Sequence, residues 1–583
     1  MPTLEWIGKS KVINHHQDVP FRVLERKYSF DENGQHDEDN GSENMIIRGD
    51  NLEALKALLP RYEGRVKCIY IDPPYNTGNE GWVYNDNVND PKIKKWLGEV
   101  VGKEGEDLTR HDKWLCMMYP RLKLLQKLLA DDGVIFISID DTEYANLKLI
   151  CDEIFGSNCF VSNISWQRTY STRNDSKGIV NEVEHLVVYS KLPDWNPNKL
   201  PRTAEMDAKY KNPDNDRTLW RTDNAFAPGA ATHQGMVYAI QHPFTGKMLY
   251  PANGRCWTFG QDQMLEIMRG WCGYELRDLN DAHERAVVCG VPESDVRQGV
   301  QAIVLSESLE ISAQKAQAVY DRGQWPRFFF TKGGKGGIAR KIYLENVGGK
   351  LPTNFWAFTE TGHTDEAKKE MLAIFDGKAT FDTPKPHRLI EFVLKVAGNE
   401  SALVLDSFAG SGTTAHAVLN MNKADGGHRK FILVEMMDYA DSITAERVKR
   451  VIRGYGEGKN AVEGTGGNFS FYDLGEPLLH GDVLNENVGV EKIREYVYFT
   501  DTKASLPESH PDEPYFMGVH IGSAYYFYYE KQAVTTLNRE FLHTVKTKAD
   551  SYVIYADLCT LSEAELEKYH ITFKKIPRDI TKL

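Results

Sequence analysis

Short apolar runs separated by amphipathic stretches mark the first part of the chain. Residues 66–71 and 134–139 are apolar, contain β-branched side chains and have the length of buried strands. Leucine and methionine recur over residues 115–129 at three- and four-residue spacing, which indicates a helix before the second of these strands. A further strand is expected at residues 45–50, and either Asp50 or Asn51 is expected to cap a helix that continues to Leu59. Strands and helices that alternate at these lengths predict a parallel sheet with right-handed crossover connections.

The same alternation returns in the second half of the chain. Apolar runs at residues 403–405 and 431–434 enclose a helix that we expect at residues 415–421. Between the two regular regions, the chain shows short strands, Pro and Gly turns and aromatic patches. We therefore predict an α/β fold with a Rossmann-like mixed sheet, an inserted recognition domain and a small α/β C-terminal domain. The expected segments are 1–44, 45–155, 156–350, 351–468 and 469–583.

Three local patterns complete this prediction. The first segment is polar, and its acidic part at residues 31–44 has little to bury, so we expect it to be flexible and ordered structure to start at Met45. Asp141 fits the N-cap position of a helix expected at residues 142–155. In the C-terminal segment, residues 562–565 have the Ser-x-x-Glu pattern of a capping box.

The composition is that of an ordinary globular chain, with 41% hydrophobic and 26% charged residues. No apolar run reaches the roughly eighteen residues of a membrane span, and the N-terminus lacks a basic-then-apolar signal, so no membrane association is expected. The eight cysteines are scattered, without a Cys-x-x-Cys pair or a Cys/His cluster at zinc spacing. We therefore expect a reducing, cytoplasmic environment and no metal.

The net charge of −13 argues against a nucleic-acid binder, but only the face that meets phosphate has to be basic. One basic run lies at residues 166–177, beside two aromatic residues, and another lies at residues 325–341, which contain no acid. A solvated basic loop is the alternative interpretation of either run. The candidate DNA-binding residues are Arg168, Arg173, Lys177, Lys332, Lys335, Arg340 and Lys341.

The tetrapeptide Asp72-Pro73-Pro74-Tyr75 stands where an expected buried strand ends, which is the usual place for ligand chemistry in an open α/β sheet. Its prolines stop the strand and hold a carboxylate, a carbonyl and an aromatic ring in one small space. Asp72 and the Pro73 carbonyl can accept both hydrogens of an exocyclic amine, and Tyr75 offers a stacking face. These four residues are candidate catalytic residues; a proline turn with a capping aspartate is the alternative. The polar, aromatic stretch that follows, up to Arg110, is expected to form a flap.

A second motif lies far downstream. A strand leads to Asp406 and then to a turn with Gly410 and Gly412, before a helix. Small residues let the backbone approach a ligand, and a helix N-terminus carries partial positive charge. No lysine follows the glycines as in a P-loop, and the Gly-x-Gly-x-x-Gly of dinucleotide sites is incomplete. Because the next strand ends in Glu435, which can accept hydrogen bonds from ribose hydroxyls, the pattern predicts a site for a nucleotide-like ligand.

These residues resemble those of a known family. Asp72–Tyr75 looks like the catalytic motif of amino-group DNA methyltransferases, and residues 406–414 look like their S-adenosylmethionine loop. The catalytic motif comes first and a long insertion separates the two, which is similar to the β-group arrangement. Residues 49–52, 362–367 and 383–386 also resemble segments of that group, in particular of the modification subunits of type III restriction–modification systems. The resemblance implies that S-adenosylmethionine would be held by, or lie close to, Asp50, Thr383, Lys385, Asp406, Phe408, Gly410, Gly412, Thr413 and Glu435.

The resemblance also implies an activity and partners. Such an enzyme transfers a methyl group from S-adenosylmethionine to N6 of an adenine flipped out of double-stranded DNA, and Asp72, where cytosine-N4 enzymes more often have Ser, favours adenine. A homodimer, a restriction (helicase-nuclease) subunit and an assembly or DNA-clamping role for the C-terminal segment are implied as well. The alternatives are an orphan or cytosine-N4 DNA methyltransferase, an enzyme that methylates RNA or protein amides, and a non-catalytic specificity or assembly subunit that keeps the fold.

Overall fold

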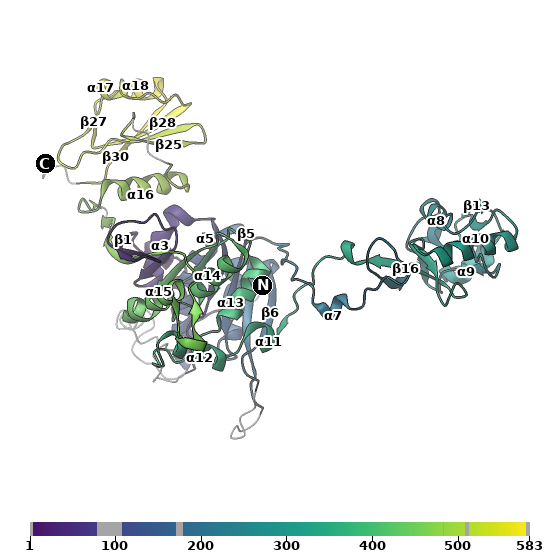
Figure 1. The fold of residues 1–583 in the computed structure, drawn as a ribbon. Coiled ribbons are helices and arrows are strands. Elements are labelled where there is room, and N and C mark those ends of the chain that lie inside the picture. The colour runs from purple at the N-terminus through teal and green to yellow at the C-terminus, as the bar shows by residue number, and fades with distance from the viewer. Residues whose placement is uncertain (1–3, 78–107, 171–178, 482, 508–511, 579–583) are drawn as a thin grey trace. The chain divides into compact units, whose positions relative to one another are not determined.

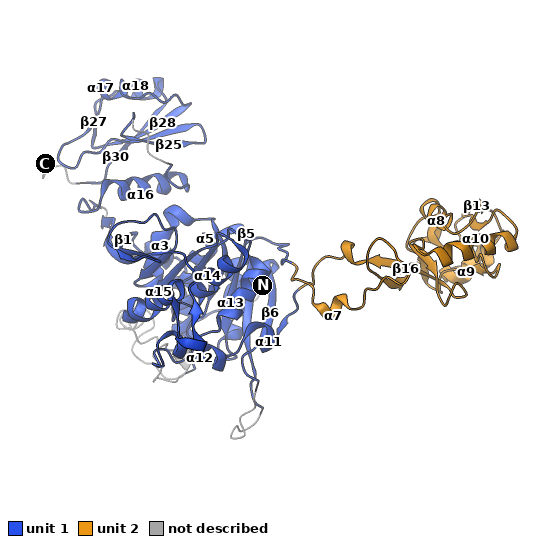
Figure 2. Ribbon diagram, in the orientation of Figure 1, with its two compact units in different colours: residues 1–198, 352–583 blue, residues 199–351 orange. Residues whose placement is uncertain are grey.

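The structure is a computed structural model that describes residues 4–77, 108–170, 179–481, 483–507 and 512–578 (Figure 1). The chain divides into two compact units. Unit 1 comprises residues 1–198 and 352–583, and unit 2 comprises residues 199–351 (Figure 2). Unit 2 is therefore an insertion in the chain of unit 1.

One large mixed sheet organises unit 1. Its described strands follow the order β17-β6-β7-β5-β4-β18-β19-β3-β22-β1-β2. The neighbours from β5 to β22 are parallel, whereas β7 runs antiparallel between β5 and β6. The strands are β1 (Arg22–Asp31), β2 (Gly34–His36), β3 (Met45–Arg48), β4 (Val66–Ile71), β5 (Leu129–Ile139), β6 (Phe160–Gln167), β7 (Val183–Ser190), β17 (Phe355–Trp356), β18 (Leu403–Asp406), β19 (Lys430–Glu435) and β22 (Phe469–Pro477). This topology confirms the predicted Rossmann-like α/β sheet.

Amphipathic helices connect the parallel strands. The helix α3 begins after Asp50, whose carboxylate accepts hydrogen bonds from the Leu52 and Glu53 amides, as expected of an N-cap. The helices of this part are α1 (Lys9–Val12), α2 (His15–Asp18), α3 (Asn51–Tyr62), α5 (Leu108–Leu128), α6 (Tyr144–Phe155), α11 (Phe358–Thr361), α12 (Thr364–Ile374), α13 (His387–Ala397), α14 (Thr413–Asp425) and α15 (Glu446–Arg453). None of the helices in the described ranges is long and apolar enough to cross a membrane.

The order of the strands reverses between β4 and β18. The chain continues from β4 to its neighbour β5 on one side, and from β18 to its neighbour β19 on the other side. In an open α/β sheet, the crevice outside the carboxyl ends of the strands at such a reversal is where ligands bind. The residues that follow β4 and β18 therefore lie at the most favourable place for a site.

The prediction that ordered structure starts at Met45 is wrong. Strand β1 lies before that residue and pairs with β22 in the large sheet. Aromatic side chains at alternate positions explain this: Tyr28 and Phe30 are buried and pack on Phe469 and Phe471. These two aromatic residues lie in a segment that is polar on average, so the strand was not recognised from the sequence.

The N-cap expected at Asp141 is also wrong. Helix α6 begins two residues later than expected, at Tyr144, and the Thr142 amide donates to Asp140 instead. The Asp141 carboxylate contacts Nε2 of His185 at 2.7 Å, across to strand β7. The sequence did not show that Asp141 has a partner on a distant strand.

Unit 2 begins at residue 199 and not at the expected residue 156, because β6 and β7 complete the large sheet. At its base, Leu200 and Lys350 exchange backbone hydrogen bonds of 2.8 Å, so the two chain segments run side by side there. Its elements are α7 (Ala204–Asp207), β8 (Trp220–Asn224), β9 (Phe226–Pro228), β10 (Ile240–Gln241), β11 (Met248–Leu249), β12 (Arg255–Trp257), α8 (Gln261–Met268), β13 (Tyr274–Arg277), α9 (Ala282–Cys289), β14 (Ala302–Leu305), α10 (Leu309–Arg322), β15 (Phe328–Phe330) and β16 (Ile338–Tyr343).

The C-terminal part builds a separate four-stranded sheet in the order β25-β26-β28-β30. The capping box of Ser562 and Glu565 opens α18, as predicted. The elements are α16 (Val490–Thr502), β25 (Phe516–His520), β26 (Ser523–Phe527), β27 (Thr536–Leu537), α17 (Arg539–Leu542), β28 (Ser551–Ala556), β29 (Leu558–Cys559), α18 (Glu563–Lys568) and β30 (Ile571–Lys575).

Candidate active site

The two motifs meet at one edge of the sheet. Strands β4 and β18 are adjacent and parallel, with Ile69 opposite Leu405. Asp72 follows the last residue of β4 and Asp406 is the last residue of β18, and the charge of Asp72 acts on the Asp406 carboxyl. The sequence distance between the two motifs exceeds three hundred residues, yet the fold makes them neighbours. An amine bound by Asp72 would therefore face the glycine turn.

The tetrapeptide after β4 is fixed by its surroundings. The indole Nε1 of Trp114, on α5, donates to the Pro74 carbonyl at 2.6 Å. The Tyr75 hydroxyl donates to Oδ1 of Asp72 at 2.8 Å. Asn76 is buried and donates to Glu143. The flap predicted for the following stretch falls mainly on residues 78–107, which lie outside the described residues.

Two residues that were not predicted at the catalytic motif complete it. Lys385 precedes α13 and was expected beside the cofactor; its ammonium instead donates to both Asp72 oxygens, at 2.8 and 2.9 Å, and to the Tyr75 hydroxyl at 2.8 Å. The carboxylate of Glu184, on β7, contacts the Tyr75 hydroxyl oxygen and lies 3.2 Å from Nζ of Lys385. An acid inside the apolar strand β7 was the available signal for Glu184.

Burial and charge set the protonation of this cluster. The Glu184 side chain is buried, and burial raises the pKa of its carboxyl to about 7, although Lys385 opposes this shift. Burial lowers the pKa of Lys385, but the charges of Asp72 and Glu184 outweigh that effect and raise its pKa above the ordinary value. Lys385 is therefore a permanent cation, whereas Glu184 can gain or lose a proton near neutral pH.

The glycine turn after β18 is held by two acids. Asp406 accepts hydrogen bonds from the Phe408 amide at 3.0 Å and from the Thr414 hydroxyl at 2.6 Å. The carboxylate of Glu435, at the end of β19, accepts one from the Gly410 amide at 2.7 Å. Gly412 has a φ of 82°, and a Cβ at this position would lie 3.0 Å from the Thr444 carbonyl oxygen, which explains the glycine.

The chemistry of the turn fits a nucleoside that carries a carboxylate. Glu435 uses one oxygen for Gly410 and the other for the Met437 amide, which leaves lone pairs for ribose hydroxyls. The buried hydroxyl of Ser407 has no hydrogen-bond partner among the described residues. Helix α14 begins directly after the turn and directs its first amides towards it. Burial raises the pKa values of Asp406 and Glu435 to about 7.

Asp50, Thr383 and Thr413 are further predicted cofactor residues. Asp50 follows β3, the neighbour of β19, where it caps α3 and contacts Arg121 at 3.4 Å. Thr383 is half-buried, two residues before Lys385. The Thr413 hydroxyl donates to the Lys385 carbonyl at 3.2 Å, so the glycine turn and the lysine of the catalytic cluster are directly joined.

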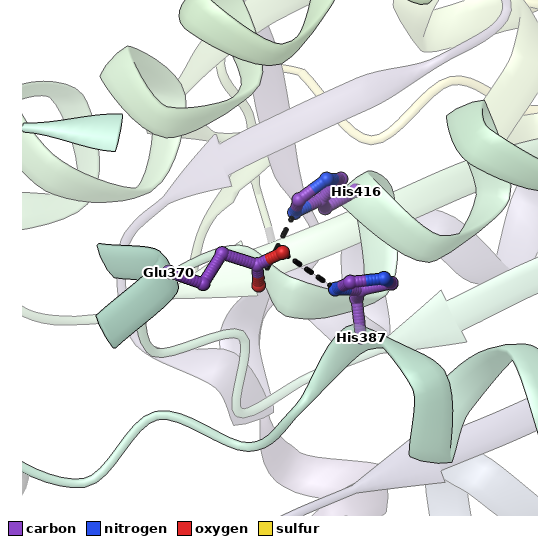
Figure 3. A group of neighbouring side chains, drawn as sticks. All are labelled: Glu370, His387 and His416. Carbon is purple, nitrogen blue, oxygen red and sulfur yellow. Dashed lines mark ion pairs between the residues drawn. The ribbon is translucent and has the colours of Figure 1, made fainter. Parts of the chain in front are cut away.

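Behind the turn, Glu370, His387 and His416 bring their ligand atoms within 4.8 Å of one another (Figure 3). Two imidazoles and a carboxylate are donors that suit a metal ion. However, Nη2 of the buried Arg447 lies 3.1 Å from Nδ1 of His416 and 3.2 Å from Glu370. This guanidinium uses the His416 lone pair and adds a fixed positive charge, both of which oppose a bound cation.

Arg447 instead supports the glycine turn. Its Nη1 donates to the hydroxyls of Ser411 at 2.9 Å and Thr413 at 2.8 Å. Glu370 balances its charge, and the pKa of Glu370 is lowered to about 2 because His387, His416 and Arg447 outweigh the effect of burial. The sequence pattern did not predict this network because its members come from four separate elements.

The predicted DNA-binding residues have different surroundings. Lys341 is fully buried in unit 2, where it pairs with Asp214 and Asp216, so its assignment to a DNA surface is wrong. Arg340 donates to Asp223 at 2.7 Å. The remaining candidates are Lys332 and Lys335, both exposed in unit 2, Arg168, half-buried in unit 1, and Arg173 and Lys177, which lie outside the described residues.

Comparison with known proteins places these motifs in a family context. The chain is 33% identical over 440 residues to the Mod subunit of the type III restriction-modification enzyme StyLTI of Salmonella typhimurium, an alignment that covers 71% of this chain and 58% of that protein. It is 29% identical over 401 residues to the type II methyltransferase M.KpnI of Klebsiella pneumoniae, with 68% and 81% covered. The chain thus spans less than two thirds of the StyLTI subunit.

A solved structure of the PvuII DNA methyltransferase (cytosine-N4-specific) aligns with 70% of this chain and 86% of that one, at 14% identity and a TM-score of 0.31, too low to add to the argument from strand order. The sequence model of the DNA methylase family N6_N4_Mtase matches residues 66–446, which is more than half of the chain and includes both motifs. The chain therefore belongs to this DNA methylase family.

Proposed function

We propose that this protein transfers a methyl group from S-adenosylmethionine to the N6 amino group of an adenine flipped out of double-stranded DNA. One observation carries the proposal: Asp72 and the glycine turn end adjacent parallel strands, so an amine acceptor faces a nucleoside-binding loop. Family membership and the StyLTI Mod subunit relationship support the same chemistry.

The residues of this chain divide the work. Asp72 and the Pro73 carbonyl accept the two amine hydrogens, which draws the nitrogen lone pair out of conjugation with the ring. Tyr75 stacks on the flipped base. Glu435, the glycine turn and the N-terminus of α14 hold the cofactor, which supplies an electrophilic methyl group when bound. No covalent enzyme intermediate is needed, so positioning and preorganised electrostatics provide the rate enhancement.

Methylation of mixed-sequence duplex DNA with tritiated S-adenosylmethionine tests the proposal directly. Digestion of the product to nucleosides should yield labelled N6-methyladenine. Labelled N4-methylcytosine would instead support the second candidate, because the family comprises both kinds of amine chemistry. Label that survives DNase but not RNase or protease treatment would contradict a DNA substrate, and an absence of label would favour a non-catalytic specificity subunit.

We further infer that the chain acts as the modification subunit of a type III restriction–modification system in the cytoplasm. The relationship to the StyLTI Mod subunit supports this assignment. The proposal includes a homodimer, a restriction subunit as partner and an assembly role for the C-terminal domain. Single-molecule sequencing of host DNA, with and without the gene, would reveal the recognition sequence. Light scattering of the purified protein, alone and with the restriction subunit, would test the assembly.

A further inference from the structure

The Tyr75 hydroxyl lies between the carboxylates of Asp72 and Glu184 and has one hydrogen to share between them. Its hydroxyl oxygen contacts a carboxylate oxygen of Asp72 and one of Glu184, and it also accepts a hydrogen bond from Lys385. A phenol has a single hydrogen, and ionised carboxylates only accept hydrogen bonds. Tyr75 can therefore satisfy one carboxylate, and the second contact requires a proton on a carboxyl group.

The proton belongs to a chain of three groups. If Tyr75 donates to Asp72, Glu184 must be protonated and donate to Tyr75; if Tyr75 donates to Glu184, the proton lies on Asp72. The two arrangements interconvert when each hydrogen moves along its own hydrogen bond. Because Lys385 binds both oxygens of Asp72, its charge favours the ionised form there and places the proton on Glu184.

We propose that Glu184 is the proton acceptor of the methylation site and acts through Tyr75 on the proton that Asp72 receives. This inference rests on the proposed function. Methyl transfer forms an N–C bond at the target amine and breaks the S–C bond of the donor, which leaves a positive charge on the nitrogen. That nitrogen loses a proton to the Asp72 carboxylate. Asp72 passes a proton to the Tyr75 oxygen while Tyr75 gives its own to the Glu184 carboxylate, and Glu184 finally releases a proton to water.

The surroundings suit this role. Glu184 does not reach the reacting atoms; it is a positioning residue that keeps Asp72 ionised. Its carboxyl is nearly fully buried, with 4% of the side chain exposed, and its pKa of about 7 permits both uptake and release of a proton. The charged or titratable groups around it are Tyr70, Asp72 and Tyr75 from β4 and the following loop, and Lys385 before α13; β6 places Trp166 opposite.

Once Glu184 carries a proton, the series Asp72–Tyr75–Glu184 cannot accept the proton that the methylated amine releases. The rate of methylation should therefore rise with pH as Glu184 ionises and level off above its pKa. Single-turnover methylation of duplex DNA by the full-length protein, from about pH 5.5 to about pH 9, tests this expectation. We expect the wild-type rate to rise close to tenfold per pH unit at the acidic end, with a midpoint near 7.

Two variants interrupt the proton transfer from Asp72 to Glu184 at different residues. Glu184→Gln and Tyr75→Phe should each lower the plateau rate by about 10- to 100-fold and abolish the rise with pH, since neither can complete the transfer. Glu143→Gln is the matched control, because Glu143 is another buried glutamate near the site but contacts Asn76 and His111 instead of Tyr75. This variant should keep the rise with pH whatever its absolute rate.

The outcomes separate the two proposals. If the wild-type protein does not methylate DNA at any pH, the proposed function fails. If the wild type is active but Glu184→Gln keeps an unchanged pH profile, only the proton chain is wrong. Equilibrium binding of S-adenosylmethionine serves as the folding check, because a Glu184→Gln protein that no longer binds it is misfolded. In that case the pH profile of Tyr75→Phe decides. A rise with pH that is unchanged in Tyr75→Phe would overturn the inference.

Discussion

The ammonium of Lys385 bridges both carboxylate oxygens of Asp72, at 2.8 and 2.9 Å, although 313 residues separate the two in sequence. The acid that we propose as the amine acceptor is therefore neutralised by a cation from the second half of the family motif region. An incoming amino group must share the Asp72 oxygens with Lys385 or displace it. Since Thr413 bonds to the Lys385 carbonyl, the glycine turn is positioned to influence that exchange.

Replacement of Asp72 should separate chemistry from binding. Asp72→Ala and Asp72→Asn are expected to lower methylation by at least about 100-fold, because the amine loses its charged acceptor, while S-adenosylmethionine still binds at the adjacent turn. Tritium transfer measures the first effect and equilibrium dialysis the second. Loss of cofactor binding by a correctly folded variant would show that Asp72 belongs to the cofactor site instead.

Removal of the Lys385 charge should destabilise the protein. Lys385→Met leaves Asp72 and Glu184 buried without a counter-charge, since these side chains are only 14% and 4% exposed. We expect a loss of about 3–5 kcal/mol in the free energy of unfolding at neutral pH, measured by urea denaturation. The double variant Lys385→Met/Glu184→Gln should recover part of this loss; equal stability of the single and double variants would contradict the electrostatic explanation.

The free energy of unfolding should fall as the pH rises from about 4 to about 7. Burial raises the pKa values of Asp406 and Glu435 to about 7, above the ordinary values of 3.8 and 4.5 that apply after unfolding. Within that window the folded protein binds more protons than the unfolded chain, so each group contributes a decrease of up to about 1.4 kcal/mol per pH unit. Glu435→Gln should flatten the profile measured by urea titration, and an unchanged slope would refute the assignment.

Weakening the Arg447 network should impair cofactor binding. Arg447→Lys cannot bond to Ser411, Thr413 and Glu370 together, so we expect a roughly tenfold higher Kd for S-adenosylmethionine, measured by calorimetry. Arg450→Lys is the control, because Arg450 lies on the same helix but pairs with Glu446 and Asp376 at the surface. Equal effects of the two substitutions would indicate a general loss of helix packing.

Exposed lysines of unit 2 should affect DNA binding through charge alone. Lys332→Ala with Lys335→Ala is expected to weaken binding uniformly across sequences and to reduce the salt dependence by about one ion per residue. Lys315→Ala is the control, since Lys315 is exposed in the same unit but paired with Glu307. An unchanged salt dependence in the double variant would remove these residues from the DNA interface.

The sequence predicted those features that depend on neighbouring residues. Strand β4, the α3 N-cap at Asp50 and the glycine turn follow from local periodicity and turn chemistry. Glu184 and Arg447 could not be assigned a role in this way, because their partners come from distant elements. Likewise, Lys341 belongs to a basic run in sequence, but the fold pairs it with Asp214, and a charge pattern does not reveal a distant partner.

The paired backbone of Leu200 and Lys350 has a consequence for how such proteins diversify. The chain enters and leaves unit 2 through two paired segments. The length and sequence of unit 2 therefore do not affect the pairing of strands in the large sheet. Replacement of unit 2 by a different domain between Leu200 and Lys350 would leave the pairing of β4 with β18 unchanged. Selection can therefore exchange unit 2, about a quarter of the chain, while the chemistry at the large sheet stays fixed.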